Sequence, residues 1–417
     1  MHAATPRTTR SRLALLGLGV LALVSPRLHA QGFGIATSAG EWLVGTPLQL
    51  SGSGDARVLR VRVGTTERSL PWSSVLGIHG PSRALAVPGP VVLDLVAGDV
   101  LVGELRGGDR AGEHLLLRSL SLGEVEVPVD RLELLRFTAR VRDDEVPRLR
   151  LQPGAKFSEA IFLRARRGFD SRLGEIHAFT ADALEFAVGA ADEPQRWLYS
   201  ELAAVAASGG EKPPRPGDAL LVTRAQDRLH VELLALADGQ LRVRLETGAE
   251  LALTLAELAA LQPMHDGIRH LSDLPTEELV ERAYFAETDV PLLAMRRDRA
   301  VTGALLRAHG HVFGKGLGVH SRSAASWRVP DGVAALTGFV ALDESVRELA
   351  VRGHAAVRVS LDGKALVTHD ALAAGSGLQP LGRLPVRAGQ LLRLEVDYGD
   401  GLDLGDRIDW LGVAFVR

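Results

Sequence analysis

A short motif that recurs four times between Trp42 and Pro263 constrains the fold more than any other feature. The motif has apolar residues at every third position, and each occurrence follows two or three short apolar segments. The motifs are Trp72–Ile78, Val129–Leu135, Tyr199–Val205 and Leu255–Leu261. A spacing of three is typical of one turn of 3₁₀ or α helix packed on a sheet. The recurrence predicts four copies of one unit. The alternative is that any all-β chain looks self-similar at this level.

The segments ahead of the motifs predict antiparallel strands joined by tight turns. Asp99–Leu105 and His230–Leu236 are apolar runs, and Gly107-Gly108 and Asp238-Gly239 are typical hairpin turns. We expect each copy to be a small bent antiparallel sheet or half-barrel. Neighbouring copies are expected to share a core, because one unit alone buries too little surface.

Two breaker-rich stretches lie between copies, the first between copies two and three and the second between copies three and four. They are predicted linkers at 143–153 and at 208–216, the second rich in glycine and proline. The expected organisation is copies one and two over 31–142, copies three and four over 153–265, and a different domain over 271–417. Pro275–Tyr284 is the best candidate for a short helix, although its acids would equally suit an extended linker.

The N-terminus has the pattern of an export signal. Three arginines precede the apolar run Leu13–Val24, and a small residue, Ala30, stands at a possible cleavage point. The first acid of the chain is Glu41. We expect residues 1–30 to be a signal peptide and the mature protein to be periplasmic or extracellular, with no membrane span after cleavage. The alternative is an anchor that stays attached. The twelve-residue run is short for spanning a bilayer.

Composition excludes several classes of function. The chain has no cysteine, so it has no disulfides, thiolate catalysis or cysteine-based metal sites. Its net charge is −3, and the expected leader holds four arginines and no acid, so the remainder is more acidic still. An acidic chain without a basic, aromatic-laced strand is a poor nucleic-acid binder. No sequence motif of a hydrolase or nucleotide-binding loop occurs.

The last third of the chain reads as a β-sandwich. Short strands alternate with glycine turns such as Asp362-Gly363. Four stretches here resemble, in order, the NPCBM family of carbohydrate-binding modules, which is associated with glycoside hydrolase family 98. They are Arg297–Gly303, Gly314–Ser323, Leu361–Lys364 and Asp397–Trp410. The resemblance implies an all-β, galactose-binding-like jelly roll over residues 271–417 that binds a glycan, in some members with calcium.

Four residues are candidates for contacting that glycan. His320 follows the glycines at 316 and 318, and its imidazole can bond a sugar hydroxyl; the alternative is a histidine that fixes the loop. Trp410 can stack on a pyranose, but its apolar neighbours favour burial in the core. Asp343 and Glu344 stand where the family has a pair of aspartates, and adjacent residues face one site only on a loop.

A series of aspartates forms the candidate metal site. Asp397, Asp400, Asp403, Asp406 and Asp409 are spaced by three and interleaved with glycines. Carboxylates on such a loop suit calcium, and the alternative is a solvated acidic loop. The charge cluster Arg296–Arg299 is expected to be solvated and internally paired.

Three hypotheses of function follow. The first is an exported, non-catalytic protein that binds a glycan or polysaccharide through its C-terminal module. The second is a structural or protein-interaction role among cell-envelope proteins, with a sandwich that no longer binds sugar. The third is an unrecognised glycoside hydrolase, because paired carboxylates leave no motif in a sequence.

Overall fold

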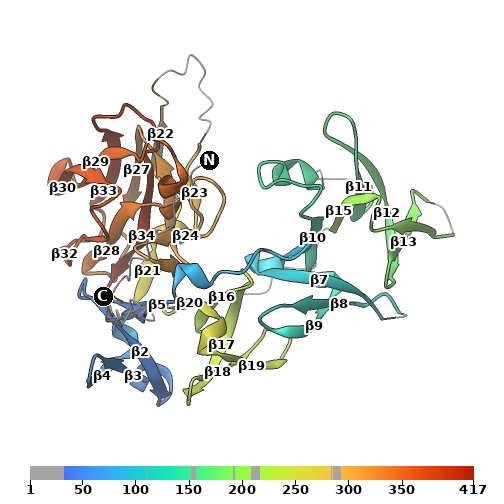
Figure 1. Cartoon of the computed structure of the whole chain (residues 1–417), viewed down its shortest axis with the longest axis horizontal. Helices are drawn as coiled ribbons and strands as arrows, with labels where there is room; N and C mark the ends of the chain where they lie inside the picture. The colour runs from blue at the N-terminus through green and yellow to red at the C-terminus, as the bar shows by residue number, and fades with distance from the viewer. Residues whose placement is uncertain are drawn as a thin grey trace, which may run out of the picture. The chain divides into compact units, whose positions relative to one another are not determined.

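The computed structural model describes residues 32–109, 111–151, 156–190, 193–207, 217–282, 284 and 293–417. The expected signal peptide and the expected linker at 208–216 lie outside these ranges. The described chain consists of antiparallel strands and short 3₁₀ turns, which confirms the all-β prediction (Figure 1). No helix in the described ranges is long and apolar enough to cross a membrane.

The four copies are four five-stranded units with one topology. Unit 1 contains β1 (Phe33–Thr37), β2 (Trp42–Ser51), β3 (Val58–Val63), β4 (Thr66–Pro71) and β5 (Val75–His79); unit 2 contains β6 (Val91–Leu95), β7 (Val100–Gly108), β8 (His114–Ser119), β9 (Gly123–Pro128) and β10 (Leu132–Phe137); unit 3 contains β11 (Glu159–Arg164), β12 (Phe169–Phe179), β13 (Ala183–Val188), β14 (Gln195–Leu198) and β15 (Leu202–Ala207); unit 4 contains β16 (Ala219–Thr223), β17 (Arg228–Ala237), β18 (Gln240–Arg244), β19 (Glu250–Thr254) and β20 (Leu258–Pro263). In every unit the last strand pairs with the first, which gives the strand order five-one-two-three-four, a bent sheet like the half-barrel that the sequence predicted.

Each recurring motif forms a turn followed by a strand. Three motifs begin with a single 3₁₀ turn, namely η2 (Trp72–Ser74), η5 (Val129–Arg131) and η7 (Leu255–Glu257), and the motif at Tyr199 begins with a hydrogen-bonded turn. The predicted turn is therefore present, but it covers only the start of the motif. The remainder is extended because it closes the sheet of its own unit.

The units are joined to one another by strand pairing. β5 of unit 1 pairs with β20 of unit 4, and β10 of unit 2 pairs with β15 of unit 3. Buried residues of all four units form one apolar cluster, as expected for units too small to stand alone. The expected linker at 143–153 packs on this assembly as far as it is described. Its turn η6 (Val146–Leu149) buries Leu149 against Val141 and Phe162.

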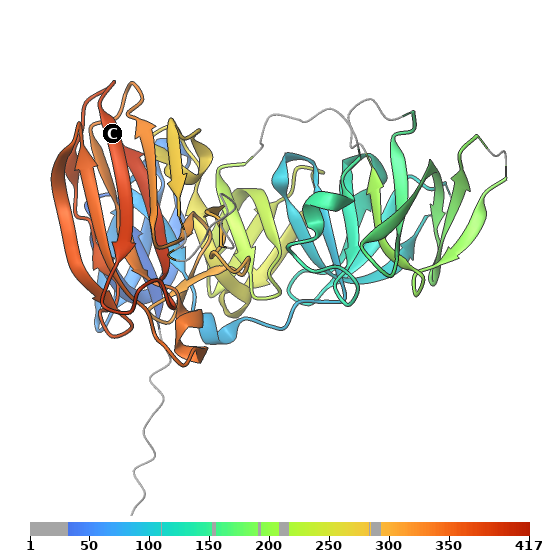
Figure 2. The ribbon, with the colours of Figure 1, turned by 90° about the horizontal axis from the view of Figure 1, so that it is seen from above.

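The C-terminal part is a β-sandwich, as predicted (Figure 2). One sheet has the order β23 (Arg296–Arg297), β26 (Gly316–His320), β34 (Arg407–Val416), β28 (Ala335–Leu342) and β31 (Gln379–Pro380), with β21 (Ile268–His270) and β32 (Leu384–Pro385) beside it; the other has the order β22 (Glu278–Glu281), β27 (Ser323–Arg328), β33 (Leu391–Tyr398), β29 (His354–Leu361) and β30 (Lys364–Ala373). The predicted helix at Pro275–Tyr284 is wrong. Its central residues form β22, whose backbone groups are satisfied by pairing with β27.

β34 is buried on both faces, which explains its continuous apolar run. Ile408 and Trp410 point into the sandwich core. Leu411, on the opposite face, packs with Phe313 of the hairpin β24 (Leu306–Ala308)–β25 (His311–Phe313) and with Leu76 of unit 1. Successive side chains of β34 point to opposite faces, so one face packs in the sandwich core and the other packs against unit 1. Residues Gly32–Arg417 form one compact unit.

Candidate functional site

Loops from both sheets of the sandwich meet at one edge, here called the rim: residues 320–322, 343–353 and 398–406. The register pairs His320 with Arg407 and Leu342 with Ile408 in one sheet, and Ala355 with Tyr398 in the other. Asp406 joins the sheets, accepting hydrogen bonds from Ser321 Oγ at 2.7 Å and from the backbone N–H of His354 at 2.8 Å. Loops that are distant in the sequence therefore converge at this edge.

His320 is half-buried at the rim. Its Nδ1 lies 2.8 Å from the carbonyl oxygen of Ser321. A carbonyl only accepts, so Nδ1 carries the hydrogen and Nε2 is left as an acceptor. No described residue bonds Nε2. The imidazole is held by its own loop and keeps one nitrogen for a hydroxyl donor.

Asp343 and Glu344 are engaged in bonds that hold the fold. Asp343 is 1% exposed, and its carboxylate accepts from the N–H of Ser345 at 2.9 Å, capping the short turn η9 (Glu344–Glu348). Glu344 accepts from Ser82 Oγ at 2.7 Å and from the N–H of Gly310. The expectation that both face a ligand is corrected: one side chain is sealed, and the other ties the sandwich to unit 1.

The structure also corrects the expected role of Trp410. Its side chain is 2% exposed and belongs to the apolar cluster of the sandwich, beside Leu317 and Trp327. An indole in this position has no face open to a pyranose ring. The alternative weighed from its neighbours, a core tryptophan, is the one the structure supports.

The five aspartates spaced by three do not form one cluster. Asp397 and Asp400 are exposed, Asp403 is half-buried and accepts from the N–H of Tyr284 at 3.1 Å, and Asp406 and Asp409 are buried. In the described ranges, no three of these carboxylates have ligand atoms within 4.8 Å of one another. The calcium expectation stays a prediction, and these acids alone do not build its site.

Asp409 instead forms a buried pair with Asp343. Burial, then the charge and hydrogen bond of Asp343, raise the pKa of Asp409 well above its usual value. A protonated Asp409 can donate to the Asp343 carboxylate, and this avoids two like charges in the interior. Arg307 donates its N–H to Asp343 at 3.4 Å. The pair is a structural device under the rim.

Two tyrosines at the rim were missed by the sequence analysis. Tyr284 and Tyr398 meet edge to face with ring centroids 5.1 Å apart, and Tyr398 donates its hydroxyl to the carbonyl of Arg282 at 3.2 Å. Tyr284 is 45% exposed. The chain has only three tyrosines, so their scarcity was a signal, but a separation of more than one hundred residues hid the pairing. The exposed ring of Tyr284, held by the half-buried Tyr398, offers the stacking surface that Trp410 does not.

A groove of about 330 Å³ runs from this edge across the outer face of the five-stranded sheet. Its lining is polar and charged, with arginines from four strands or strand ends and no aromatic residue: Arg282, Arg322, Arg358 and Arg393 face Asp370, Glu395 and Asp397. Arg282 and Arg322 exchange backbone hydrogen bonds, which places the groove beside the tyrosine pair. The arrangement combines a ring surface with hydrogen-bonding groups suited to hydroxyls.

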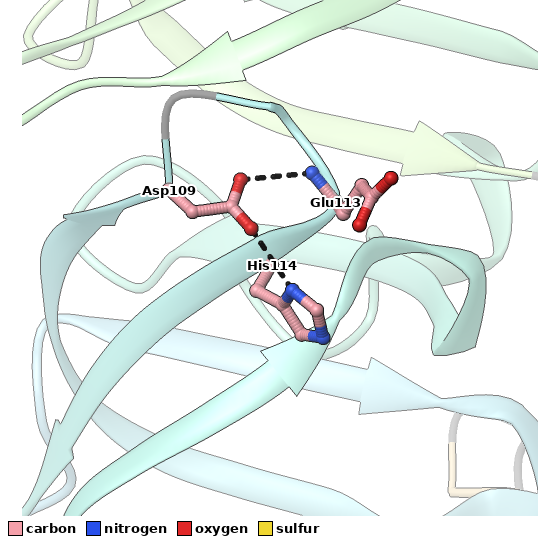
Figure 3. Close-up of side chains that lie close together, drawn as sticks. All are labelled: Asp109, Glu113 and His114. Atoms are coloured by element: carbon pink, nitrogen blue, oxygen red, sulfur yellow. Dashed lines mark hydrogen bonds and ion pairs between the residues drawn. The ribbon is translucent and has the colours of Figure 1, made fainter.

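One further cluster has metal-ligand chemistry. Asp109, Glu113 and His114, at the β7–β8 hairpin, have ligand atoms within 4.8 Å of one another (Figure 3). Asp109 accepts from the N–H of Glu113 and from His114 Nδ1, both at 2.9 Å, and the latter bond raises the pKa of His114. These bonds fasten the turn and account for the proximity of the side chains.

The fold and the rim define the C-terminal part as a β-sandwich domain whose strand-end loops gather at one edge. This domain belongs to the NPCBM family: residues 271–416 match the model of the NPCBM/NEW2 domain. NPCBM domains are carbohydrate-binding modules. No curated protein matches the chain.

Several solved structures are similar at low identity. CBM51-2 with GlcNAc and INT domains from Clostridium perfringens ZmpB is 20% identical, with a TM-score of 0.32 over 46% of this chain and 42% of that one. CBM51 from Clostridium perfringens GH95 in complex with methyl-galactose is 15% identical, with a TM-score of 0.31 over 36% of this chain and 99% of that one. The tandem CBM51 modules of Sp3GH98 from Streptococcus pneumoniae SP3-BS71 are 11% identical, with a TM-score of 0.31 over 92% of this chain and 88% of that one.

Proposed function

We propose that this protein is an exported, non-catalytic glycan-binding protein whose C-terminal domain holds the sugar at the rim. The observation that carries the proposal is the pair of the exposed Tyr284 and the half-buried Tyr398, which lies at the same edge as His320 and beside the polar groove. A pyranose ring has an apolar face for an aromatic side chain and hydroxyls for polar ones. The family of the domain supports the same function.

Two features of the sequence support the finer parts of the proposal. The basic and apolar N-terminus has the order of an export signal. The acids that the structure buries in units 2 and 4, such as Asp99 and Asp227, bond backbone N–H groups, a ring nitrogen or hydroxyls. They are therefore engaged in structural bonds, which favours binding without hydrolysis.

Affinity electrophoresis of the full chain tests the proposal. Native gels would contain neutral polysaccharides that bear galactose, glucose or N-acetylglucosamine. We expect retardation by at least one of them, and Tyr284→Ala to weaken it roughly tenfold through loss of stacking. Tyr284→Phe keeps the ring and should retain binding.

A matched control uses the same loop region. Leu404 is 52% exposed, so Leu404→Ala removes an apolar side chain from the rim without removing a ring. It should bind like the parent protein. Equal retardation of all four proteins, or none by any glycan with folding verified, contradicts the proposal.

A further inference from the structure

A large cavity of the described chain lies away from the rim. It measures about 1080 Å³, and three separate parts of the chain line it. Unit 2 contributes β6, β7, β10 and the loop around Val141–Arg150; unit 4 contributes Gln226 and Arg228; the C-terminal domain contributes residues 296–304. The volume is that of a ligand site rather than a packing defect.

The lining of this cavity is strongly basic. It holds seven arginines and three aspartates: Arg136, Arg142, Arg150, Arg228, Arg296, Arg297 and Arg299 against Asp94, Asp143 and Asp298. This concentration stands out because the whole chain is slightly acidic, at −3. A concave surface of one sign focuses its field on ligands of the opposite sign.

The aspartates are already engaged. Asp298 binds Arg228 Nη2 at 2.5 Å and Lys315 Nζ at 3.0 Å, and these two cations lower its pKa below the usual range although burial opposes them. Asp143 binds Arg136 at 2.9 Å. The expectation that the cluster Arg296–Arg299 pairs internally is therefore wrong, because its only acid is bonded to two cations outside the cluster.

Three guanidinium groups of the lining have no hydrogen-bonded or ion-paired partner within the described ranges. Arg150, Arg296 and Arg299 make no hydrogen bond or ion pair with any residue that the structure describes. Arg299 is half-buried, and burial, then the charge of Arg228, lower its pKa to about 10, although the charges of Asp143 and Asp94 oppose this shift. It remains a cation at neutral pH, but in surroundings that disfavour its charge. A bound anion would relieve that cost.

We propose that this cavity binds an acidic saccharide, with its carboxylate or sulfate held by Arg299 and Arg296. Guanidinium groups bind such oxyanions through paired, charge-assisted hydrogen bonds. Valines on β6 and β7 supply apolar walls, and Thr138, Thr302 and Gln226 supply groups that bond hydroxyls. The lining contains no aromatic residue on which a nucleic-acid base would stack.

Titration calorimetry on the full chain tests this site. The probes are polygalacturonate for carboxylates, dextran sulfate for sulfates, and dextran as the neutral match. We expect binding of polygalacturonate or dextran sulfate that weakens with salt, and none of dextran. Arg299→Gln should weaken it roughly 10- to 100-fold, the loss expected for charge-assisted hydrogen bonds. Arg296→Gln provides a second variant if Arg299→Gln folds poorly.

The control variant makes the same change of charge elsewhere. Arg68, on β4, is exposed and lies outside the cavity, so Arg68→Gln should change affinity less than twofold. Equal losses in Arg68→Gln and Arg299→Gln would overturn the proposal, because they would indicate non-specific attraction. So would binding of inorganic phosphate alone, or tighter binding of a single-stranded oligonucleotide with the same dependence on Arg299.

Variants at the rim and in the cavity distinguish a failure of this inference from a failure of the proposed function. Tyr284→Ala should leave binding of the acidic probe unchanged, and Arg299→Gln should leave retardation by a neutral glycan unchanged. Loss of both kinds of binding in both variants would overturn the inference of a second site.

Discussion

Aspartates at the contacts between the N-terminal units and aspartates on the exposed loop of the sandwich rim play opposite roles. Between the units, the buried Asp99 of unit 2 accepts from the N–H of His230 in unit 4 at 2.9 Å, and the half-buried Asp218 of unit 4 pairs with Arg57 of unit 1. At the rim of the sandwich, Asp397 and Asp400 are exposed. A carboxylate at a contact between units stabilises the fold, whereas one on the exposed loop of the rim remains available to a ligand.

The largest effect should come from the joint at Asp227. This residue is 0% exposed and accepts from the N–H of Val102 at 2.8 Å, Ser119 Oγ at 2.8 Å and Thr223 Oγ1 at 2.6 Å. Asp227→Ala leaves three buried donors unbonded, so the free energy of unfolding should fall by about 3–5 kcal/mol. Urea denaturation measures it. A loss below about 1 kcal/mol would mean that the units do not depend on this joint.

A second test uses pH at the seam between unit 1 and the sandwich. His79 stacks with Phe313 at a centroid distance of 4.2 Å and bonds the carbonyl of Val312 at 2.9 Å. Burial lowers the pKa of His79 from 6.5 to about 3, against the opposing effect of the Val312 hydrogen bond. Above pH 6.5 neither state binds the proton. Below it the unfolded chain does, so stability is lost as the pH falls towards 3.

His79→Phe removes this titration and keeps an aromatic ring at the seam. Between pH 6.5 and 5, the parent protein should lose about 2 kcal/mol more than the variant, at 1.36 kcal/mol per pH unit for one group. His270, whose pKa burial lowers to about 4, keeps titrating in both proteins and cancels in the difference. Parallel stability curves for the two proteins would show that His79 is not neutral in the fold.

The parts of the fold that could be predicted are those fixed by neighbours in sequence. The 3₁₀ turns at Trp72, Val129 and Leu255 follow from apolar spacing within a few residues. The strands after them, such as β5, are fixed by pairing with strands far away in the sequence. β22 shows the same effect, because pairing with β27 overrode a local helix pattern.

The site was predicted in outline and missed in detail for the same reason. The sequence named His320 as a candidate because it follows two glycines, and the structure has it half-buried at the rim. Whether Trp410 faces the core or a ligand depends on the second sheet, which no local pattern reveals. The contact of Tyr284 with Tyr398 and the gathering of arginines around Arg299 are likewise properties of the assembled chain.

A smaller effect is expected under the rim, at Asp409. Because burial and Asp343 raise its pKa, the folded protein keeps the proton that the unfolded chain releases above its usual pKa of 3.8. Its contribution is therefore present at low pH and lost as the pH rises. Asp409→Asn keeps a neutral side chain of the same shape, so it should be more stable than the parent at pH 8 by on the order of 1 kcal/mol. Thermal unfolding at pH 5 and pH 8 measures the difference, and a variant that is less stable at both would refute the protonated pair.

The smallest effect should come from the exposed rim, at Asp400, which completes the comparison with Asp227. Asp400→Asn should change the free energy of unfolding by less than about 0.5 kcal/mol, because no buried donor loses its acceptor. Urea denaturation in calcium and in a chelator also tests the predicted metal. If calcium stabilises the parent protein and Asp400→Asn abolishes that gain, the acidic loop is a metal site completed by backbone oxygens. If calcium and chelator give the same curve, the acids of the loop face solvent. Asp227 then stabilises the fold through its buried hydrogen bonds, and Asp400 does not.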